Sequence, residues 1–319
     1  MLKDATMPEK EFKEIIQQEL ASTEQQLSDP QNLAANAMQR YMAPYPKSDV
    51  RYTATPQEEI AELKVAKIED ARKFYKDFYG GSDATISIVG DFDEDAAKKL
   101  LTEGVGSWKS PKGFKRLEAQ NFNLAAKNEV IKTPDKANAM FFATLNVPMR
   151  DDDAEYPALE MANTVLGGGA LSSRLANRIR QKEGISYGVG SQFQVDALDK
   201  KGSLVAYAIY APENVERLEK AFKEEVEKII KEGISAEELA EAKKYIAQNR
   251  LVGRSNDRQM SSKLNTYQFL NRDMKWEAAY EDKLAKITLE DVNKAIKKHI
   301  DMSKISIFKA GDFDKVKKP

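Results

Sequence analysis

Two stretches of this chain, far apart in the sequence, repeat the same order of residues. The first runs from Ala66-Lys67-Ile68 to the tag Gly90-Asp91-Phe92-Asp93, and the second runs from Ala285-Lys286-Ile287 to Gly311-Asp312-Phe313-Asp314. The two tags lie 221 residues apart (311 − 90). A repeat of this length indicates duplicated domains and excludes a solenoid of short repeats.

The repeat is incomplete at its front. Residues 8–43 correspond to 235–271, whereas residues 127–232 have no earlier counterpart. Their counterpart would precede Met1, so we expect the chain to be a piece of a longer protein. The predicted domains are the second half of one module over 1–110 and a complete module over 120–319.

The composition excludes several classes of function. The chain has 50 basic and 51 acidic side chains, and this balance gives no electrostatic basis for binding nucleic acid or an anionic membrane. The sequence contains no cysteine, which excludes disulfides, thiol catalysis and cysteine-bound metal. A cysteine-free chain is compatible with the cytoplasm or the periplasm, and we expect a periplasmic or other extracytoplasmic location.

The order of predicted elements indicates an α+β fold. In the second module, strands are expected first, then mostly helices, then one returning strand at Ile305–Phe308. Residues 185–195 alternate apolar with polar or small side chains, as a half-buried strand does. In the first module we expect helices and one short strand, Ala84–Val89. We therefore predict duplicated modules with helices packed on a mainly antiparallel or mixed sheet.

The chain resembles the pitrilysin/insulinase family of zinc metallopeptidases. The resemblance rests on the order of elements, the two tags, the segment Leu166-Gly167-Gly168-Gly169-Ala170-Leu171-Ser172-Ser173-Arg174-Leu175, and the segment Arg180-Gln181-Lys182-Glu183-Gly184-Ile185-Ser186-Tyr187. It implies α+β modules paired into clam-like halves around a peptide-binding chamber. It also implies that the intact protein hydrolyses peptides and that this chain is its C-terminal, substrate-enclosing portion.

The family's zinc motif, His-x-x-Glu-His, is absent. The chain has a single histidine, His299, which we expect to serve at the surface near a helix C-terminus. The family's distant metal-binding glutamate would fall at Leu20-Ala21-Ser22, while the nearby Glu19 and Glu24 are expected in solvent. Asp151-Asp152-Asp153 is expected to begin a helix. We therefore predict no catalytic residue and no metal in this chain, with zinc held by the catalytic module of the parent enzyme.

The glycine run Gly167, Gly168 and Gly169 has two interpretations. It ends a helix, and the next helix is then capped by Ser172 or Ser173. Three glycines exceed what a helix end needs, so close approach of another backbone is also expected. In the resembling family this loop takes part in substrate handling.

Arg180 and Tyr187 match an arginine and a tyrosine of the family's non-catalytic half, which reach across the closed chamber to the peptide. A guanidinium offers a fork of donors to peptide carbonyls. A tyrosine hydroxyl can donate to a developing oxyanion. The alternative is an exposed arginine in a salt bridge with a residue such as Glu183, and a tyrosine packed in a strand.

Two further functions remain open. The chain could be a non-catalytic binding subunit of a two-chain peptidase-like assembly, or a scaffold that keeps the fold without a chamber function. The expected partners are a peptide substrate and an upstream catalytic module or partner subunit. A homodimer through the exposed N-terminal half-module is a further expectation.

Overall fold

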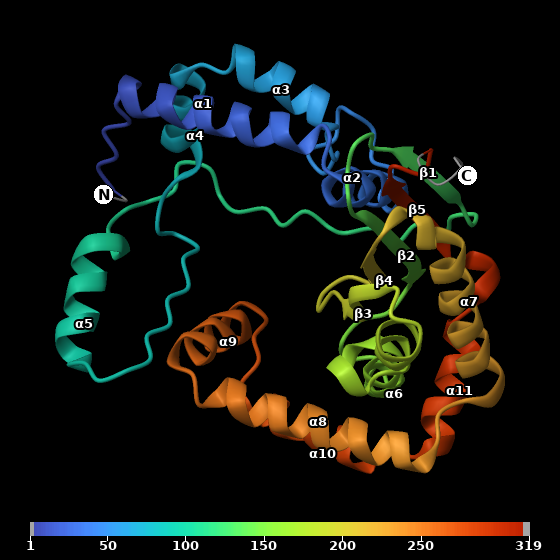
Figure 1. Cartoon of the computed structure of the whole chain (residues 1–319). Helices are drawn as coiled ribbons and strands as arrows, with labels where there is room; N and C mark the ends of the chain where they lie inside the picture. Colours follow the sequence, from blue (N-terminus) through green and yellow to red (C-terminus); the bar gives the residue numbers. More distant parts are fainter. Residues whose placement is uncertain (1–2, 315–319) are drawn as a thin grey trace. The chain divides into compact units, whose positions relative to one another are not determined.

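The computed structural model describes residues 3–314, which form two compact units (Figure 1). The first unit comprises Met1–Glu24, Pro56–Glu118 and Arg250–Trp276. The second comprises Gln25–Thr55, Ala119–Asn249 and Glu277–Pro319. Each unit therefore draws on both segments that the sequence divides at 110–120. The predicted domain ends at Met1 and Pro319 lie outside the described residues.

The first unit is helical. Two of its helices begin at a capping side chain: Asp93 accepts a hydrogen bond from the backbone N–H of Ala96 across 2.8 Å, and Asn256 accepts one from that of Gln259 across 3.0 Å. Pro56 occupies a first helical position, where its missing N–H is not needed. The helices are α1 (Glu9–Gln26, whose last two residues enter the second unit), α3 (Pro56–Val65), α4 (Ile68–Phe78), α5 (Glu94–Leu101), the π-helix η1 (Thr102–Gly106) and α9 (Asp257–Phe269).

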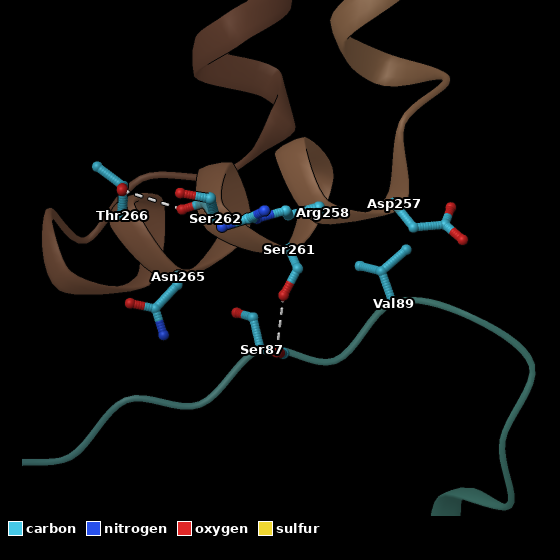
Figure 2. A pocket seen from close by; sticks show the side chains of 8 residues that line it. All are labelled: Ser87, Val89, Asp257, Arg258, Ser261, Ser262, Asn265 and Thr266. Carbon is cyan, nitrogen blue, oxygen red and sulfur yellow. Dashed lines mark hydrogen bonds between the residues drawn. The ribbon is translucent and has the colours of Figure 1, made fainter.

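The strand predicted at Ala84–Val89 does not form, which corrects the expectation from the sequence. These residues run as an extended segment beside α9 (Figure 2), and no strand of the described part of the chain pairs with them. Side chains of α9 bind two of their carbonyls instead. Ser261 Oγ donates to the carbonyl of Ser87 and Asn265 Nδ2 to that of Thr85, each across 2.8 Å.

The second unit contains a five-stranded mixed sheet in the order β1-β5-β2-β4-β3. Three of the four strand pairings are antiparallel, while β1 runs parallel to β5. The strands are β1 (Asn128–Lys132), β2 (Ala139–Val147), β3 (Ser186–Val195), β4 (Gly202–Tyr210) and β5 (Ser306–Gly311). The predicted α+β fold with a mainly antiparallel sheet is confirmed.

Helices cover both faces of this sheet. Successive side chains of a strand point to opposite faces of the sheet, and two neighbours in β2 illustrate this. Met140 packs against Ala34 of α2. Phe141 contacts Phe222 of α7 edge-on, with ring centroids 5.3 Å apart. Because every residue of β5 is buried, the returning strand lies in the middle of the core. The helices are α2 (Pro30–Met42), α6 (Tyr156–Asn163), α7 (Val215–Glu232), α8 (Ala236–Arg254, crossing into the first unit), α10 (Met274–Lys286) and α11 (Leu289–His299).

Candidate functional site

The glycine run lies where a helix passes close to β3. Helix α6 continues into a π-helical turn, η2 (Thr164–Gly168). A Cβ on Gly167 would lie 2.5 Å from the backbone nitrogen of Ser191 in β3, a distance that no real Cβ tolerates. Ser191 Oγ also donates to Asn163 Oδ1 across 2.7 Å. The expected close approach of a second backbone is confirmed at Gly167.

The other two glycines tighten the turn itself. A Cβ on Gly168 would lie 2.7 Å from Asn163 Nδ2, and one on Gly169 would lie 2.7 Å from the carbonyl oxygen of Thr164. Gly169 N–H donates to that same carbonyl. Ser172 and Ser173 then bond back to the carbonyls of Gly169 and Ala170. The run is thus both a helix end and a packing site.

Arg180 and Tyr187 flank a sharp change of direction. Arg180 belongs to the π-helix η4 (Ala176–Lys182). Gly184 follows with φ +64°, a left-handed conformation that glycine adopts at little cost. Strand β3 then begins at Ser186.

Tyr187 is the extra residue of a β-bulge. In the pairing of β3 with β4, Ser186 lies opposite Tyr210 and Gly188 lies opposite Ile209, so Tyr187 has no partner of its own. Ser186 Oγ fixes this turn, with contacts of 2.7 Å to the carbonyl oxygen of Ile209 and 3.0 Å to that of Gly188. A bulge re-aims the side chain it carries, and Tyr187 is 85% exposed.

The guanidinium of Arg180 lies over the ring of Tyr187, with Cζ 4.9 Å from the ring centroid. This is the geometry of a cation–π contact. The contact orders both side chains while the Tyr187 hydroxyl makes no hydrogen bond within the described part of the chain. The structure therefore brings the two predicted residues together, with Arg180 half-buried and Tyr187 exposed.

The salt bridge considered for Arg180 does not form. Glu183 instead binds Arg178 at 2.7 Å and Arg217 at 3.5 Å. Arg178 also binds Glu224 at 2.7 Å. Among the described residues, no carboxylate pairs with Arg180, so its donors are left for another partner.

Arg174 has a structural role that the sequence pattern did not reveal. Its guanidinium binds the carboxylate of Glu238 in α8 through two hydrogen bonds of 2.7 Å. It also donates to the carbonyl of Gly233, which follows α7. Ser235 and Glu238 also cap the start of α8, as their spacing in the sequence allows, but nothing in the sequence indicates their arginine partner.

The residues present do not form a zinc site. His299 Nε2 lies 2.8 Å from Glu155 Oε2, and Lys298 binds the same carboxylate. The hydrogen bonds from Lys298 and then His299 hold the pKa of Glu155 below its usual range. Asp152 and Asp153 bind Arg150. Within residues 3–314, no cluster of three histidine, aspartate or glutamate side chains could hold a metal ion.

Comparison with known proteins decides the family. The sequence profile described as "Peptidase M16 inactive domain" matches residues 66–246, more than half of the chain. The chain belongs to the peptidase M16 inactive domain family. The resemblance to the pitrilysin/insulinase peptidases is thereby confirmed. Membership in the inactive-domain family agrees with the lack of a zinc motif in this chain.

Two curated relatives of the M16 chain carry different descriptions. "Non-peptidase homolog YmxG" of Helicobacter pylori is 23% identical over 249 residues, which cover 76% of this chain and 55% of that protein. "Uncharacterized zinc protease" of Rickettsia felis is 28% identical over 183 residues, which cover 56% of this chain and 42% of that protein. The M16 chain thus spans about half the length of these relatives.

A solved structure shares the fold. The peptidase M16 inactive domain from Pseudomonas fluorescens superimposes with a TM-score of 0.80 at 23% identity, covering 97% of this chain and 72% of that one. Within residues 3–314, every helix of the M16 chain is too short or too polar to cross a lipid bilayer.

Proposed function

We propose that this M16 chain is the non-catalytic, substrate-enclosing part of a zinc peptidase that hydrolyses peptides. The observation that carries the proposal is the contact between Arg180, which is half-buried on η4, and Tyr187, which is exposed on a β-bulge, with Cζ of the arginine 4.9 Å from the ring centroid. Tyr187 is too exposed for its ring to serve the packing of the core, and Arg180 forms no ion pair within the described residues. The donors of these two side chains suit an extended peptide.

The two side chains offer complementary donors. The guanidinium presents a planar fork that can bind peptide carbonyls in the ground state. The phenol can donate to an oxygen that gains negative charge during hydrolysis. Gly167, Gly168 and Gly169 would support this surface because the turn they form packs on β3, the strand that carries Tyr187.

The catalytic chemistry would come from a second M16 module, upstream in the same polypeptide or on a partner subunit. Zinc would belong to that module, since no cluster of side chains within residues 3–314 fits a metal ion. The name of the Rickettsia felis relative, a zinc protease, agrees with zinc in the family. We further propose a periplasmic or other extracytoplasmic location.

The experiment compares the chain alone with the assembled enzyme. We expect the purified chain to hold less than about one-tenth of an equivalent of zinc by elemental analysis, and to cleave no peptide. Added to a catalytic M16 module, the chain should produce cleavage that a chelator abolishes. One equivalent of tight zinc and chelator-sensitive cleavage by the chain alone would overturn the proposal.

A second candidate is a non-catalytic binding or scaffold subunit. The description of the Helicobacter pylori relative as a non-peptidase homologue favours it. The two candidates differ in one property of the assembly. A binding subunit retains peptide without cleavage, whereas a scaffold assembles with its partner and has no affinity for peptide.

A further inference from the structure

Ser186 is a buried residue at the start of the strand that carries Tyr187. Its exposed fraction is 5%, in contrast to 85% for its neighbour Tyr187. A buried hydroxyl in a folded protein is almost always hydrogen bonded. Ser186 Oγ lies 2.7 Å from the carbonyl oxygen of Ile209 and 3.0 Å from that of Gly188. Neither contact takes part in the function proposed for Arg180 and Tyr187.

The hydroxyl of Ser186 connects the backbone on the two sides of Tyr187. Gly188 and Ile209 face each other as the first pair of residues beyond the bulge. A serine hydroxyl carries one hydrogen, so the two carbonyls share it, and the shorter contact, with Ile209, is the stronger one. Ser186 thus links the residue before the bulge to both strands immediately after it. One side chain therefore holds closed the piece of backbone that carries Tyr187.

The ring of Tyr187 has little else to fix its direction. No residue of β4 lies opposite Tyr187, since Ser186 pairs with Tyr210 and Gly188 with Ile209. The side chain is also too exposed for the core to hold it. Among the described residues, the one contact of its ring with a charged or aromatic group is with the guanidinium of Arg180, at 4.9 Å. The shape of the bulge therefore decides where the ring and its hydroxyl point.

We propose that Ser186 is a positioning residue, which aims Tyr187 by holding the β-bulge in one shape. The inference rests on the proposed function, because it takes the Tyr187 hydroxyl as the donor to the oxygen that gains negative charge. Such a donor acts only within hydrogen-bond reach of that oxygen, and a displacement of about 1 Å removes much of its effect. Ser186 would therefore control turnover through Tyr187 without touching the peptide.

A second buried serine of the same sheet separates this role from ordinary stabilisation. Ser306 in β5 is 2% exposed, and its Oγ accepts a hydrogen bond of 3.1 Å from the backbone N–H of Lys127. Strands β2 and β4 separate β5 from β3 in the sheet. Ser306→Ala and Ser186→Ala each remove one buried hydroxyl, so both should lower the urea midpoint of unfolding. Only Ser186→Ala should change the direction of Tyr187.

The first test measures the direction of the ring by NMR in the full chain. The ring current of Tyr187 shifts the δ protons of Arg180, whose signal is assigned with Arg180→Lys. Tyr187→Leu defines the position of this signal without the ring. In Ser186→Ala we expect the shift to fall by about half or more, because the bulge loses the hydroxyl that holds it closed. In Ser306→Ala we expect the shift to stay within about one-tenth of its value in the parent.

The second test measures cleavage by the assembled enzyme. We expect Ser186→Ala to lower kcat by about fivefold with little change in KM, and to have no further effect in a Tyr187→Phe background. Ser306→Ala should leave both constants unchanged.

Two results would overturn the proposal. One is a ring-current shift that survives Ser186→Ala, and the other is a parental kcat for Ser186→Ala in an enzyme that Tyr187→Phe slows. A parental kcat for Tyr187→Phe would instead overturn the proposed function. The NMR shift involves no cleavage, so it would still decide whether Ser186 aims the ring.

Discussion

The guanidinium of Arg174 and the carboxylate of Glu238 form a bidentate pair, with Nε–Oε1 and Nη2–Oε2 distances of 2.7 Å. Their side chains are 14% and 31% exposed. The pair joins the segment after the glycine run to the first turn of α8. Hydrogen bonds from the backbone N–H of Ser235 to the carboxylate and from Arg174 to the carbonyl of Gly233 complete the junction.

Breaking this junction should destabilise the second unit. We expect Arg174→Ala to lower the free energy of unfolding by about 2 to 4 kcal/mol, because Glu238 would keep a partly buried charge without its partner. Arg178→Ala is the matched control: its ion pairs are more exposed and should contribute less than about 1 kcal/mol. Urea unfolding of both variants measures the difference, and equal losses would show that the junction has no special role.

Acid should weaken the fold through Glu219. This carboxylate is partly buried, which opposes its charge, but hydrogen bonds from Lys223 and Lys309 outweigh the burial and lower its pKa below the ordinary value of 4.5. A carboxyl whose pKa is lower in the folded state stabilises the fold above the unfolded value. Its contribution is therefore complete above about pH 4.5 and is lost as the pH falls through the folded pKa.

The matching variant is Glu219→Gln. It should be less stable than the parent at pH 7, because Lys309, 9% exposed, loses its partner. The gap between variant and parent should narrow as the pH falls from about 5 to 3. Urea unfolding midpoints across this pH range measure the gap in stability. Glu213→Gln, a substitution at an exposed glutamate, is the control. A gap that stays constant with pH would contradict this account of Glu219.

The glycine run allows a clean test of packing. Gly167→Ala should cost about 1 to 3 kcal/mol, since its Cβ would lie 2.5 Å from the nitrogen of Ser191. Gly188→Ala in the same sheet should change stability by less than about 0.5 kcal/mol, because its Cβ would meet only Ile209 at 3.7 Å. Thermal melting of the two variants separates them. If both variants melt at the temperature of the parent, the close packing of Gly167 on Ser191 does not constrain the residue at this position.

Many individual helices and strands could be predicted from the sequence, because the patterns that specify them lie within each element. Alternation over 185–195, for example, predicted β3. The strand at Ala84–Val89 was wrong for a physical reason: a strand needs neighbours, and its own sequence cannot show whether they are present. The interleaving of the two units was likewise invisible, since it depends on contacts between distant segments.

The site was predictable in part. The resemblance picked out Arg180 and Tyr187, and the structure places the guanidinium over the tyrosine ring. The π-helical register of η4 and the bulge at Tyr187 were not predictable, because both depend on how β3 pairs with β4 and packs on its neighbours. The Arg174–Glu238 pair was missed for the same reason, since 64 residues separate its members.

The most direct test of the proposed function is the cleavage kinetics of the assembled enzyme with Tyr187→Phe and Arg180→Ala, measured beside the melting temperature of each variant. We expect Tyr187→Phe to lower kcat by about tenfold or more with little change in KM, because its hydroxyl would act mainly in the transition state. Arg180→Ala should also raise KM, since its donors would serve the ground-state peptide as well. Both variants should melt within a few degrees of the parent, because Tyr187 is 85% exposed and Arg180 has no ion pair in the described part of the chain. Unchanged kinetics together with a melting temperature lowered by many degrees would contradict the account and make both residues structural.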